Sequence, residues 1–274
     1  MTDRYAVIGN PVAQSKSPLI HAAFARAAAQ DLEYMTIEAP LDGFAASVAS
    51  FAAAGGRGLN VTVPFKLQAF ALAHTRSARA EAAGACNTLR RDGNGWHADN
   101  TDGAGLLRDL AVNLGVAIEG RDVLVLGAGG AARGMLRPLA DARPRSLSIA
   151  NRTHAKAHAL AAGMRQHAHV EALDTVALAQ RDFDVVINAT SAGMLRDMPL
   201  PWPATLFRRD AFAYDIVYAD APTLFIRFAR AAGVARAADG LGMLIEQAAE
   251  SFLLWRGVRP ETSAIFAMLR PPPA

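Results

Sequence analysis

The sequence predicts an α/β protein with two domains. Its 274 residues exceed the ~150 residues of an average single domain. The first hundred residues alternate short apolar runs with alanine-rich stretches, and a second series of the same kind begins at Asp122. Because alternating strands and helices form mostly parallel, helix-covered sheets, we expect one open sheet in residues 1–102 and another in residues 103–239.

The first domain should follow the order strand, helix, strand, helix, strand. The strands are expected at RYAVIGN, EYMTIEA and GLNVTVP, with helices near residues 17–29 and 42–54. The next segments, NTLRRD and WHADNT, are separated by GNG, which is typical of a hairpin turn. We therefore expect an antiparallel hairpin that leads into the segment DNTDG.

The second domain should contain four strands, DVLVL, SLSIA, FDVVINAT and AFAYDIVY, with helical stretches between them. After Gly240, apolar residues recur at helical spacing and form one face. We expect this helix, within residues 240–274, to pack back on the first domain and complete it. The apolar face consists of Leu241, Leu244, Ile245, Ala248, Phe252 and Trp255.

Composition argues against several classes of function. The chain has no run of ~18 apolar residues and its N-terminus is unlike a signal peptide, so we expect a cytoplasmic protein without a membrane partner. The net charge is +3, but no aromatic-rich basic stripe points to nucleic acid. The histidines are scattered without metal-ligand spacing, and Cys86 is expected to be a packed residue. The sequence leaves a homodimer open.

A glycine-rich turn follows the first strand of the second domain. DVLVL runs directly into GAGGAAR and a helix, so that Gly127, Gly129 and Ala132 occupy the positions of a GxGxxG/A motif. Small residues there allow a tight turn and a close approach of the backbone to a pyrophosphate at the helix N-terminus. The alternative is an ordinary turn between strand and helix. With this context complete, the motif predicts a Rossmann-type dinucleotide-binding domain.

The residues after the next strand indicate which dinucleotide binds. An NAD enzyme usually has an acid there, but SLSIA ends in Asn151, Arg152 and Thr153. A guanidinium and a hydroxyl can bind a 2′-phosphate through charge-assisted hydrogen bonds, which favours NADP. The alternative is that Arg152 is a solvated residue and that Asn151 and Thr153 cap the next helix.

Polar side chains gather at the ends of predicted strands in the first domain, where open α/β sheets bind ligands. Hydroxyls, amides and a lysine–aspartate pair suit a small ligand with several hydroxyl groups and a carboxylate. As structural alternatives, Ser17 and Asp102 could cap helices and Lys66 could be solvated. The clusters are Ser15, Lys16 and Ser17 in NPVAQSKSP, Asn60, Thr62 and Lys66 in LNVTVPFK, Asn87 in CNT, and Asn100 and Asp102 in DNTDG.

Eight motifs together carry a resemblance to a known family. They are GNPVAQSKSP, NVTVPFK, AGACNT, DNTDG, GAGGAAR, NRT, NATSAGM and ADGLGMLIEQAA. Through them the chain resembles the bacterial shikimate dehydrogenases along nearly its whole length. The resemblance implies NADPH-linked, reversible reduction of 3-dehydroshikimate to shikimate in the chorismate route to aromatic amino acids. It also implies an N-terminal substrate domain, an NADP-binding domain, and a cleft that closes about a hinge.

The resemblance also implies roles for single residues. Lys66 should be the proton donor and acceptor, supported by Asp102, while Ser15 and Ser17 should bind the substrate carboxylate. The ring hydroxyls should be bound by Thr62, Lys66, Asn87, Asp102 and Gln247, with Tyr218 also at the substrate. Asn60 is expected at the substrate because of its place in the polar clusters. The cofactor should be bound by Gly127, Ala128, Gly129, Gly130, Ala131, Asn151, Arg152, Thr153 and Lys156, with Thr190, Ile216 and Gly240 near the nicotinamide.

The chain departs from the family pattern at two positions. Gln14 stands where many relatives have His, and Lys156 stands where some have Arg, which weakens any bidentate contact with a phosphate there. Two alternatives stay open. One is a quinate/shikimate dehydrogenase that uses NAD, although the acid typical of that branch is absent. The other is a non-catalytic paralogue, against which the presence of both Lys66 and Asp102 argues.

Overall fold

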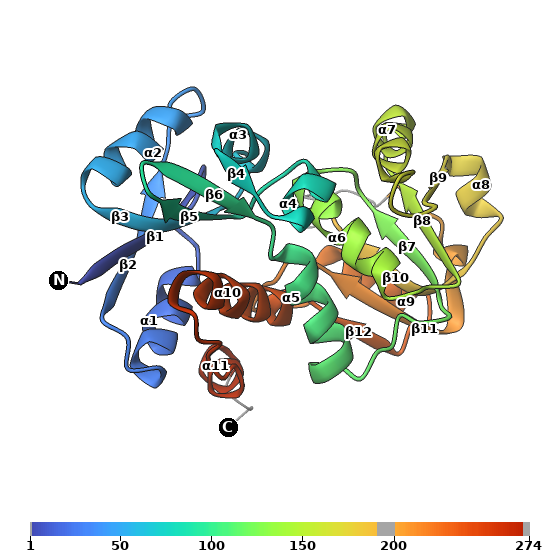
Figure 1. Cartoon of the computed structure of the whole chain (residues 1–274). Helices are drawn as coiled ribbons and strands as arrows, with labels where there is room; N and C mark the ends of the chain where they lie inside the picture. Colours follow the sequence, from blue (N-terminus) through green and yellow to red (C-terminus); the bar gives the residue numbers. More distant parts are fainter. Residues whose placement is uncertain (1, 191–200, 271–274) are drawn as a thin grey trace. The chain divides into compact units, whose positions relative to one another are not determined.

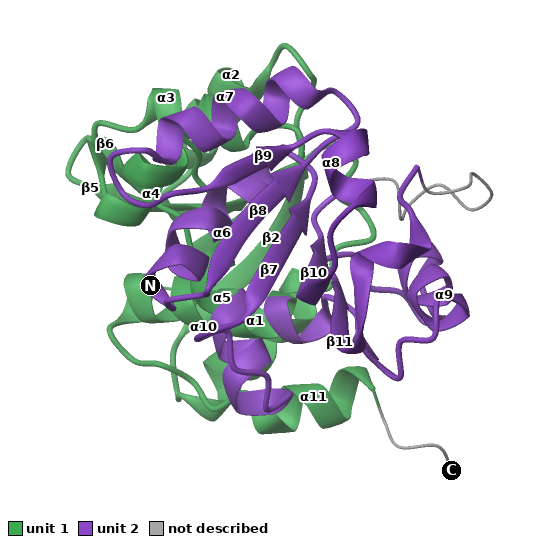
Figure 2. Ribbon diagram, turned by 90° about the vertical axis from the view of Figure 1, so that its right-hand side faces the viewer, with its two compact units in different colours: residues 1–105, 244–274 green, residues 106–243 purple. Residues whose placement is uncertain are grey.

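The computed structural model describes residues 2–190 and 201–270 and divides into two compact units (Figures 1 and 2). Unit 1 comprises residues 1–105 and 244–274, and unit 2 comprises residues 106–243. Each unit is built around one six-stranded sheet. The chain passes between the units within two helices, α5 (Asp102–Arg108) and α10 (Leu241–Arg256). The protein therefore has the expected two-unit α/β architecture.

The sheet of unit 1 has the strand order β2-β1-β3-β5-β6-β4. The first three strands are parallel, and β5 and β6 form the antiparallel hairpin that GNG predicts. The register pairs Val7 with Asn60, Asn60 with Thr88, and Thr88 with Asp99, so the segments that carry the polar clusters meet at one edge. The strands are β1 (Asp3–Gly9), β2 (Leu32–Glu38), β3 (Gly56–Val61), β4 (Thr75–Arg76), β5 (Thr88–Asp92) and β6 (Gly95–Asp99).

Helices cover the sheet of unit 1 through apolar faces at helical spacing. Helix α2 buries Phe44, Val48 and Phe51, which recur every three to four residues. Helix α10 packs against α1 through the rings of Phe252 and Phe24, whose centres lie 5.9 Å apart. The other helices of this unit's described part are α1 (Ser17–Ala27), α3 (Lys66–Leu72), α4 (Ala78–Ala83) and α11 (Ser263–Leu269), and α2 spans Phe44–Ala53.

The sheet of unit 2 is wholly parallel, with the order β12-β11-β10-β7-β8-β9. This is the doubly wound order of dinucleotide-binding domains, in which the strand order reverses between β7 and β10. Ligands bind such sheets at that reversal, beyond the carboxyl ends of the strands. The strands are β7 (Asp122–Leu126), β8 (Ser146–Ala150), β9 (Glu171–Leu173), β10 (Phe183–Asn188), β11 (Phe207–Asp215) and β12 (Arg236–Ala238).

Strand β7 is buried on both faces because helices cover both sides of this sheet. Val123 and Val125 belong to one apolar cluster, whereas Leu124 and Leu126 belong to another. Such an uninterrupted apolar run is typical of a parallel strand buried between two helical layers. The helical segments are α6 (Gly130–Asp141), α7 (His154–Met164), α8 (Thr175–Ala179), α9 (Leu224–Ala231), a π-helical turn at Asp109–Asn113 and a 3₁₀ turn at Ala204–Leu206.

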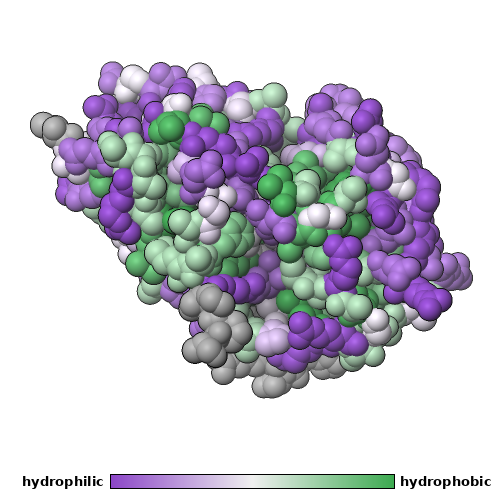
Figure 3. Space-filling view, turned by 90° about the horizontal axis from the view of Figure 1, so that it is seen from below, coloured by the Kyte–Doolittle hydropathy of each residue, from purple (hydrophilic) through white to green (hydrophobic). Residues whose placement is uncertain are grey.

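The surface mixes polar and apolar side chains. On the face that Figure 3 displays, charged and polar residues are interspersed with groups of apolar ones. Among the described residues, no helix combines the length and the hydropathy that crossing a membrane requires.

Two glycines of the turn after β7 differ in what a side chain would meet. Gly127 has φ +111°, and an added Cβ would lie 2.9 Å from the carbonyl carbon of Ala189. Gly129 has φ −85°, and an added Cβ would have no neighbour within 4 Å. We expect Gly127→Ala to lower the free energy of unfolding by about 1–3 kcal/mol and Gly129→Ala to change it by about 0.5 kcal/mol or less, in urea titrations. Equal losses in both variants would contradict this strain argument.

Candidate active site

Lys66 and Asp102 form a buried ion pair in unit 1. Lys66 is the first residue of α3, and Asp102 is the first residue of α5. The Lys66 ammonium donates a hydrogen bond to the Asp102 carboxylate, and the two side chains are only 14% and 6% exposed. The solvated-lysine alternative is therefore wrong. Nor does the carboxylate of Asp102 serve as a helix cap, because its hydrogen bonds go to side chains.

The amide of Asn87 holds the other oxygen of this carboxylate. Asn87 is 3% exposed, and its Nδ2 donates to Asp102 Oδ1 at 2.8 Å. The same nitrogen lies 2.9 Å from Thr101 Oγ1 and 3.2 Å from Gln247 Oε1, so its two hydrogens are shared among three acceptors. Thr101 N in turn donates to Asn87 Oδ1 at 2.8 Å. Both carboxylate oxygens of Asp102 therefore accept hydrogen bonds, one from Lys66 and one from Asn87. Gln247, on α10, belongs to the same hydrogen-bonded cluster.

Asn60 lies behind this cluster and is also buried. Its Oδ1 accepts a hydrogen bond from Tyr34 Oη at 2.8 Å and lies 3.1 Å from His21 Nε2. Its Nδ2 donates to Ser251 Oγ at 2.9 Å and approaches Thr88 Oγ1 at 3.3 Å. Because protein groups already occupy both ends of this amide, we interpret Asn60 as a support for the cluster, and its contact with substrate stays a prediction.

The two donors to Asn60 are held neutral by burial. Burial lowers the pKa of His21 to about 3, against a smaller upward effect of its hydrogen bond with Asn60. Burial likewise raises the pKa of Tyr34 well above its ordinary value. The imidazole also stacks on the Tyr34 ring, with centres 4.3 Å apart. The charge of the cluster is therefore confined to Lys66 and Asp102.

Ser15 and Thr62 lie on neighbouring loops, and Ser17 begins helix α1. The loop after β1 and the loop after β3 are joined by a hydrogen bond from Asn10 N to Val63 O, at 3.0 Å. Ser15 Oγ accepts from Ser17 N at 3.3 Å. Ser17 is buried as the first residue of α1, but the N-cap position belongs to the preceding lysine, so the helix-cap alternative for Ser17 is wrong.

Sequence reasoning did not assign roles to Thr101, Ser251, His21 or Tyr34. Ser251 follows Gln247 by four residues on α10 and accordingly shares its helix face, a signal that was present in the sequence. The side chain of Asn100 forms hydrogen bonds with the backbone: its Nδ2 donates to Ala85 O, and its Oδ1 accepts from Asp102 N.

Cys86 is a packed residue, as expected. It is fully buried, its Sγ lies 3.1 Å from Thr88 O, and burial raises the pKa of its thiol to about 12. Because the thiolate is the reactive form, Cys86 is not suited to act as a nucleophile.

The turn after β7 leaves room for a dinucleotide in unit 2. Gly127 N donates to Ala150 O at 2.7 Å, which ties the turn to β8. Gly129 is the N-cap of α6 and supplies no side-chain cap, and the space in front of it is open to 4 Å. The first amides of a helix are free to bind an anion, so residues 127–131 fit a pyrophosphate.

Residues after β8 fit a 2′-phosphate. Arg152, Thr153 and Lys156 are exposed around the start of α7, and neither cation has an ion-pair partner among residues 2–190 and 201–270. Thr153 is the N-cap of α7 but makes no side-chain cap bond, and Asn151 Nδ2 instead donates to Thr153 O at 2.9 Å. The capping alternative is therefore wrong for Thr153. Arg152 is exposed, which agrees both with a contact to the 2′-phosphate and with a solvated surface residue.

A buried carboxylate orders the ends of β10 and β11. Asn188 Oδ1 accepts from Thr190 Oγ1 at 2.7 Å, and Asn188 Nδ2 donates to Asp215 Oδ1 at 2.9 Å. Thr223 Oγ1 donates to Asp215 Oδ2 at 2.6 Å. Burial raises the pKa of Asp215 to about 6, against the lowering effect of these hydrogen bonds.

Three further predicted residues of unit 2 lie near this carboxylate. Ile216 N donates to Asn188 O at 3.0 Å, and Gly240 N donates to Val217 O at 3.2 Å, so Thr190, Ile216 and Gly240 come together. Tyr218 follows three residues after the end of β11. Of the NATSAGM motif, residues 191–194 lie outside the described residues.

We expect the stability of the protein to carry a pH dependence from Asp215. Because the folded pKa of about 6 exceeds the ordinary 3.8, the folded state holds this proton more tightly, and stability falls as the pH rises through that interval. The side chain of Asp215→Asn cannot ionise. In urea unfolding, the free energy of unfolding of this variant should therefore rise by about 3 kcal/mol relative to that of wild type between roughly pH 4 and pH 7. A difference between the two proteins that does not change with pH would contradict the assignment.

Known proteins match nearly the whole chain. Family models match residues 7–89 (shikimate dehydrogenase substrate binding domain), 109–196 (shikimate / quinate 5-dehydrogenase) and 240–265 (shikimate 5′-dehydrogenase C-terminal domain). The shikimate dehydrogenase (NADP(+)) of Aromatoleum aromaticum is 58% identical over 98% of this chain and 97% of its own.

Solved structures agree with these matches. An Ael1 enzyme from Pseudomonas putida has a TM-score of 0.91 and 50% identity, over 99% of both chains. Shikimate 5-dehydrogenase from Thermus thermophilus, in complex with NADP(H) and shikimate, has a TM-score of 0.86 and 32% identity, over 96% of this chain and 97% of its own. With a fold and a sequence shared from end to end, this chain belongs to the shikimate dehydrogenase family.

Proposed function

We propose that this protein catalyses the reversible, NADPH-dependent reduction of 3-dehydroshikimate to shikimate, a step toward chorismate and the aromatic amino acids. It is an NADP-dependent oxidoreductase whose curated relatives are shikimate dehydrogenases (NADP(+)). The observation that carries the proposal is the buried pair of Lys66 and Asp102, fixed by the amide of Asn87. We also propose that the reaction takes place in the cytoplasm.

Unit 1 binds the substrate in this proposal. The hydroxyls of Ser15 and Ser17 bind its carboxylate, and Thr62, Asn87 and Gln247 bind ring hydroxyls. Gln247 and Asn87 are already hydrogen-bonded to each other, so their orientation is set before the substrate arrives. Binding groups that are held in place lose little entropy on complex formation.

Unit 2 binds the nucleotide. Residues 127–131 receive the pyrophosphate at the start of α6, and Arg152 and Thr153, with Asn151 and Lys156 beside them, bind the 2′-phosphate. Thr190, Ile216 and Gly240 lie together at the ends of β10 and β11, where the nicotinamide is expected. The exposed guanidinium of Arg152 would favour NADP over NAD because only NADP offers it a phosphate.

The chemistry on the chain's side is a proton transfer. A nucleotide held by residues 127–131 and 151–156 would supply the hydride when bound, and the carbonyl oxygen of the substrate would gain negative charge as the new C–H bond forms. Lys66 Nζ donates a proton to that oxygen, while Asp102 holds the ammonium in position and Asn87 holds Asp102. In the direction of shikimate oxidation, the neutral amine of Lys66 accepts the proton from the hydroxyl.

The function is tested by mixing the purified protein with shikimate and either NADP or NAD and following the absorbance of the reduced nicotinamide. We expect rapid reduction of NADP and much slower reduction of NAD. A parallel assay with quinate separates the quinate/shikimate alternative. Absence of reduction with every pair would favour the non-catalytic paralogue, and equal rates with the two nucleotides would contradict the NADP assignment.

Removal of the proton donor should slow turnover. We expect Lys66→Ala to lower kcat about a hundredfold to ten-thousandfold, with a much smaller change in KM, because general acid–base action contributes that much. Gln68→Ala, an exposed change on the same helix, serves as the control and should leave both constants unaltered. If Lys66→Ala kept kcat within a fewfold of wild type, the proton would have to come from elsewhere.

Removal of the phosphate-binding cation should weaken NADP selectively. We expect Arg152→Ala to raise the KM for NADP about tenfold to a hundredfold, because a charge-assisted hydrogen bond contributes roughly 1.5–3 kcal/mol, and to leave the KM for NAD nearly unchanged. Arg165→Ala, also exposed and at the other end of α7, removes the same charge as a control. A parallel rise of KM for both nucleotides would show that Arg152 does not contact the phosphate.

A further inference from the structure

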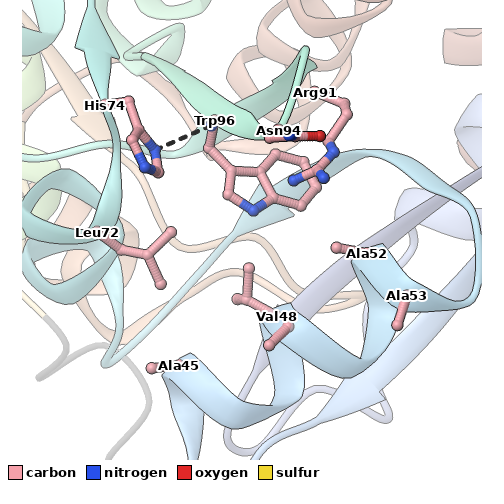
Figure 4. A pocket seen from close by; sticks show the side chains of 10 residues that line it. Ala45, Val48, Ala52, Ala53, Leu72, His74, Arg91, Asn94 and Trp96 are labelled. Atoms are coloured by element: carbon pink, nitrogen blue, oxygen red, sulfur yellow. Dashed lines mark hydrogen bonds between the residues drawn. The ribbon is translucent and has the colours of Figure 1, made fainter.

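A pocket lies in unit 1 between helix α2, the end of α3 and the β5–β6 hairpin (Figure 4). Its volume is about 450 Å³, within the range of small-molecule sites. Val48 and Ala52 of α2 and Leu72 at the end of α3 form its apolar wall, and Arg91, Trp96 and His74 lie opposite them. Nothing in the proposed reaction uses these residues.

The pocket is separate from the polar cluster of Lys66 and Asp102. Helix α3 begins at Lys66 and reaches the pocket only at Leu72, which is about 9 Å further at 1.5 Å per residue. Arg91 lies on β5, about 13 Å beyond Asn87, the residue just before this strand, at roughly 3.3 Å per residue. A ligand of the pocket would therefore not compete with the substrate for the same groups.

Trp96 presents an unused hydrogen-bond donor to the pocket. The side chain is 4% exposed, and its Nε1 has no hydrogen-bond partner within the described part of the chain. Figure 4 shows the indole nitrogen on the side of the ring that faces α2. Because no acceptor of the described residues engages this N–H group where it faces the pocket, an acceptor on a ligand could form a hydrogen bond with it.

The side chains of Arg91 and His74 beside Trp96 also offer donors, and Asn94, which lines the pocket too, carries an amide that both donates and accepts. The Arg91 guanidinium lies over the indole, 5.4 Å from the ring centre, and makes no ion pair with any acid among the described residues. His74 Nδ1 accepts a hydrogen bond from Trp96 N at 3.3 Å, which leaves its Nε2 as the protonated nitrogen. No acidic residue lines the pocket. The charge and the donors thus favour an anion, while the wall of α2 favours hydrocarbon.

We propose that this pocket binds a small aromatic carboxylate. The carboxylate accepts hydrogen bonds from Arg91 and from Trp96 Nε1, and the ring packs against Val48, Ala52 and Leu72. The site goes beyond the proposed oxidoreductase activity, and it can be tested independently of that activity.

The test is an NMR titration of the full-length protein with ¹⁵N-labelled tryptophan, in the presence of saturating shikimate. The chain has three tryptophans, so three indole N–H signals are expected, and Trp96→Phe assigns the one from the pocket. We expect 2-naphthoate to shift the Trp96 signal in a saturable manner and to leave the signals of Trp202 and Trp255 in place. 2-Naphthol, which lacks the charge, should bind at least about tenfold more weakly.

Arg91→Gln and Arg90→Gln form a matched pair for this titration, because alternate residues of β5 point to opposite faces of the sheet. Arg91→Gln should weaken naphthoate binding about tenfold or more, and Arg90→Gln should change it less than about twofold. Ala49→Trp, which fills the pocket from α2, should abolish the shift. The proposal is overturned if the Trp96 signal does not move, if Arg91→Gln binds as wild type does, or if shikimate displaces the naphthoate.

Discussion

The amide of Asn87 is the interaction on which the candidate active site depends. It connects the hydroxyl of Thr101 and the carboxylate of Asp102 with the amide of Gln247, which is 160 residues away from Asn87 in the sequence. All of these groups are buried, so the loss of one partner would leave another unsatisfied, at about 1–3 kcal/mol each. This mutual dependence is what keeps the Lys66 ammonium in one place, and general acid catalysis requires a donor that is held in position.

In unit 2, the backbone of the parallel strands and the buried carboxylate of Asp215 position the candidate ligand site. Parallel strands bring the turn after β7 and the end of β10 together at the point where strand order reverses. Asp215 then joins Asn188 and Thr223, and Asn188 bonds Thr190. Burial raises the pKa of Asp215, so the ionised carboxylate lowers the stability of the folded state at neutral pH.

Local patterns predicted much of the architecture. The strand DVLVL with its glycine-rich turn and the hairpin at GNG depend on neighbouring residues alone, and both are present in the structure. Strands β4, β9 and β12 contain only two or three residues, too few for a periodic pattern, and they were not expected. Gln247 was identified only through the family resemblance, since it is 160 residues from Asn87. His21 and Tyr34 had no signal at all, because their contacts with Asn60 arise from tertiary packing.

The central claim is that Lys66 and Asp102 act as a unit, and a double-mutant cycle on kcat tests it most directly. Lys66→Ala, Asp102→Asn and the double variant would be compared with wild type under saturating shikimate and NADP. If the pair is one unit, Asp102→Asn lowers kcat on its own, but the double variant is within a fewfold of Lys66→Ala, because the second change removes nothing further. If the two losses multiply instead, the residues act independently, and the account of a carboxylate that serves only to hold the lysine is wrong.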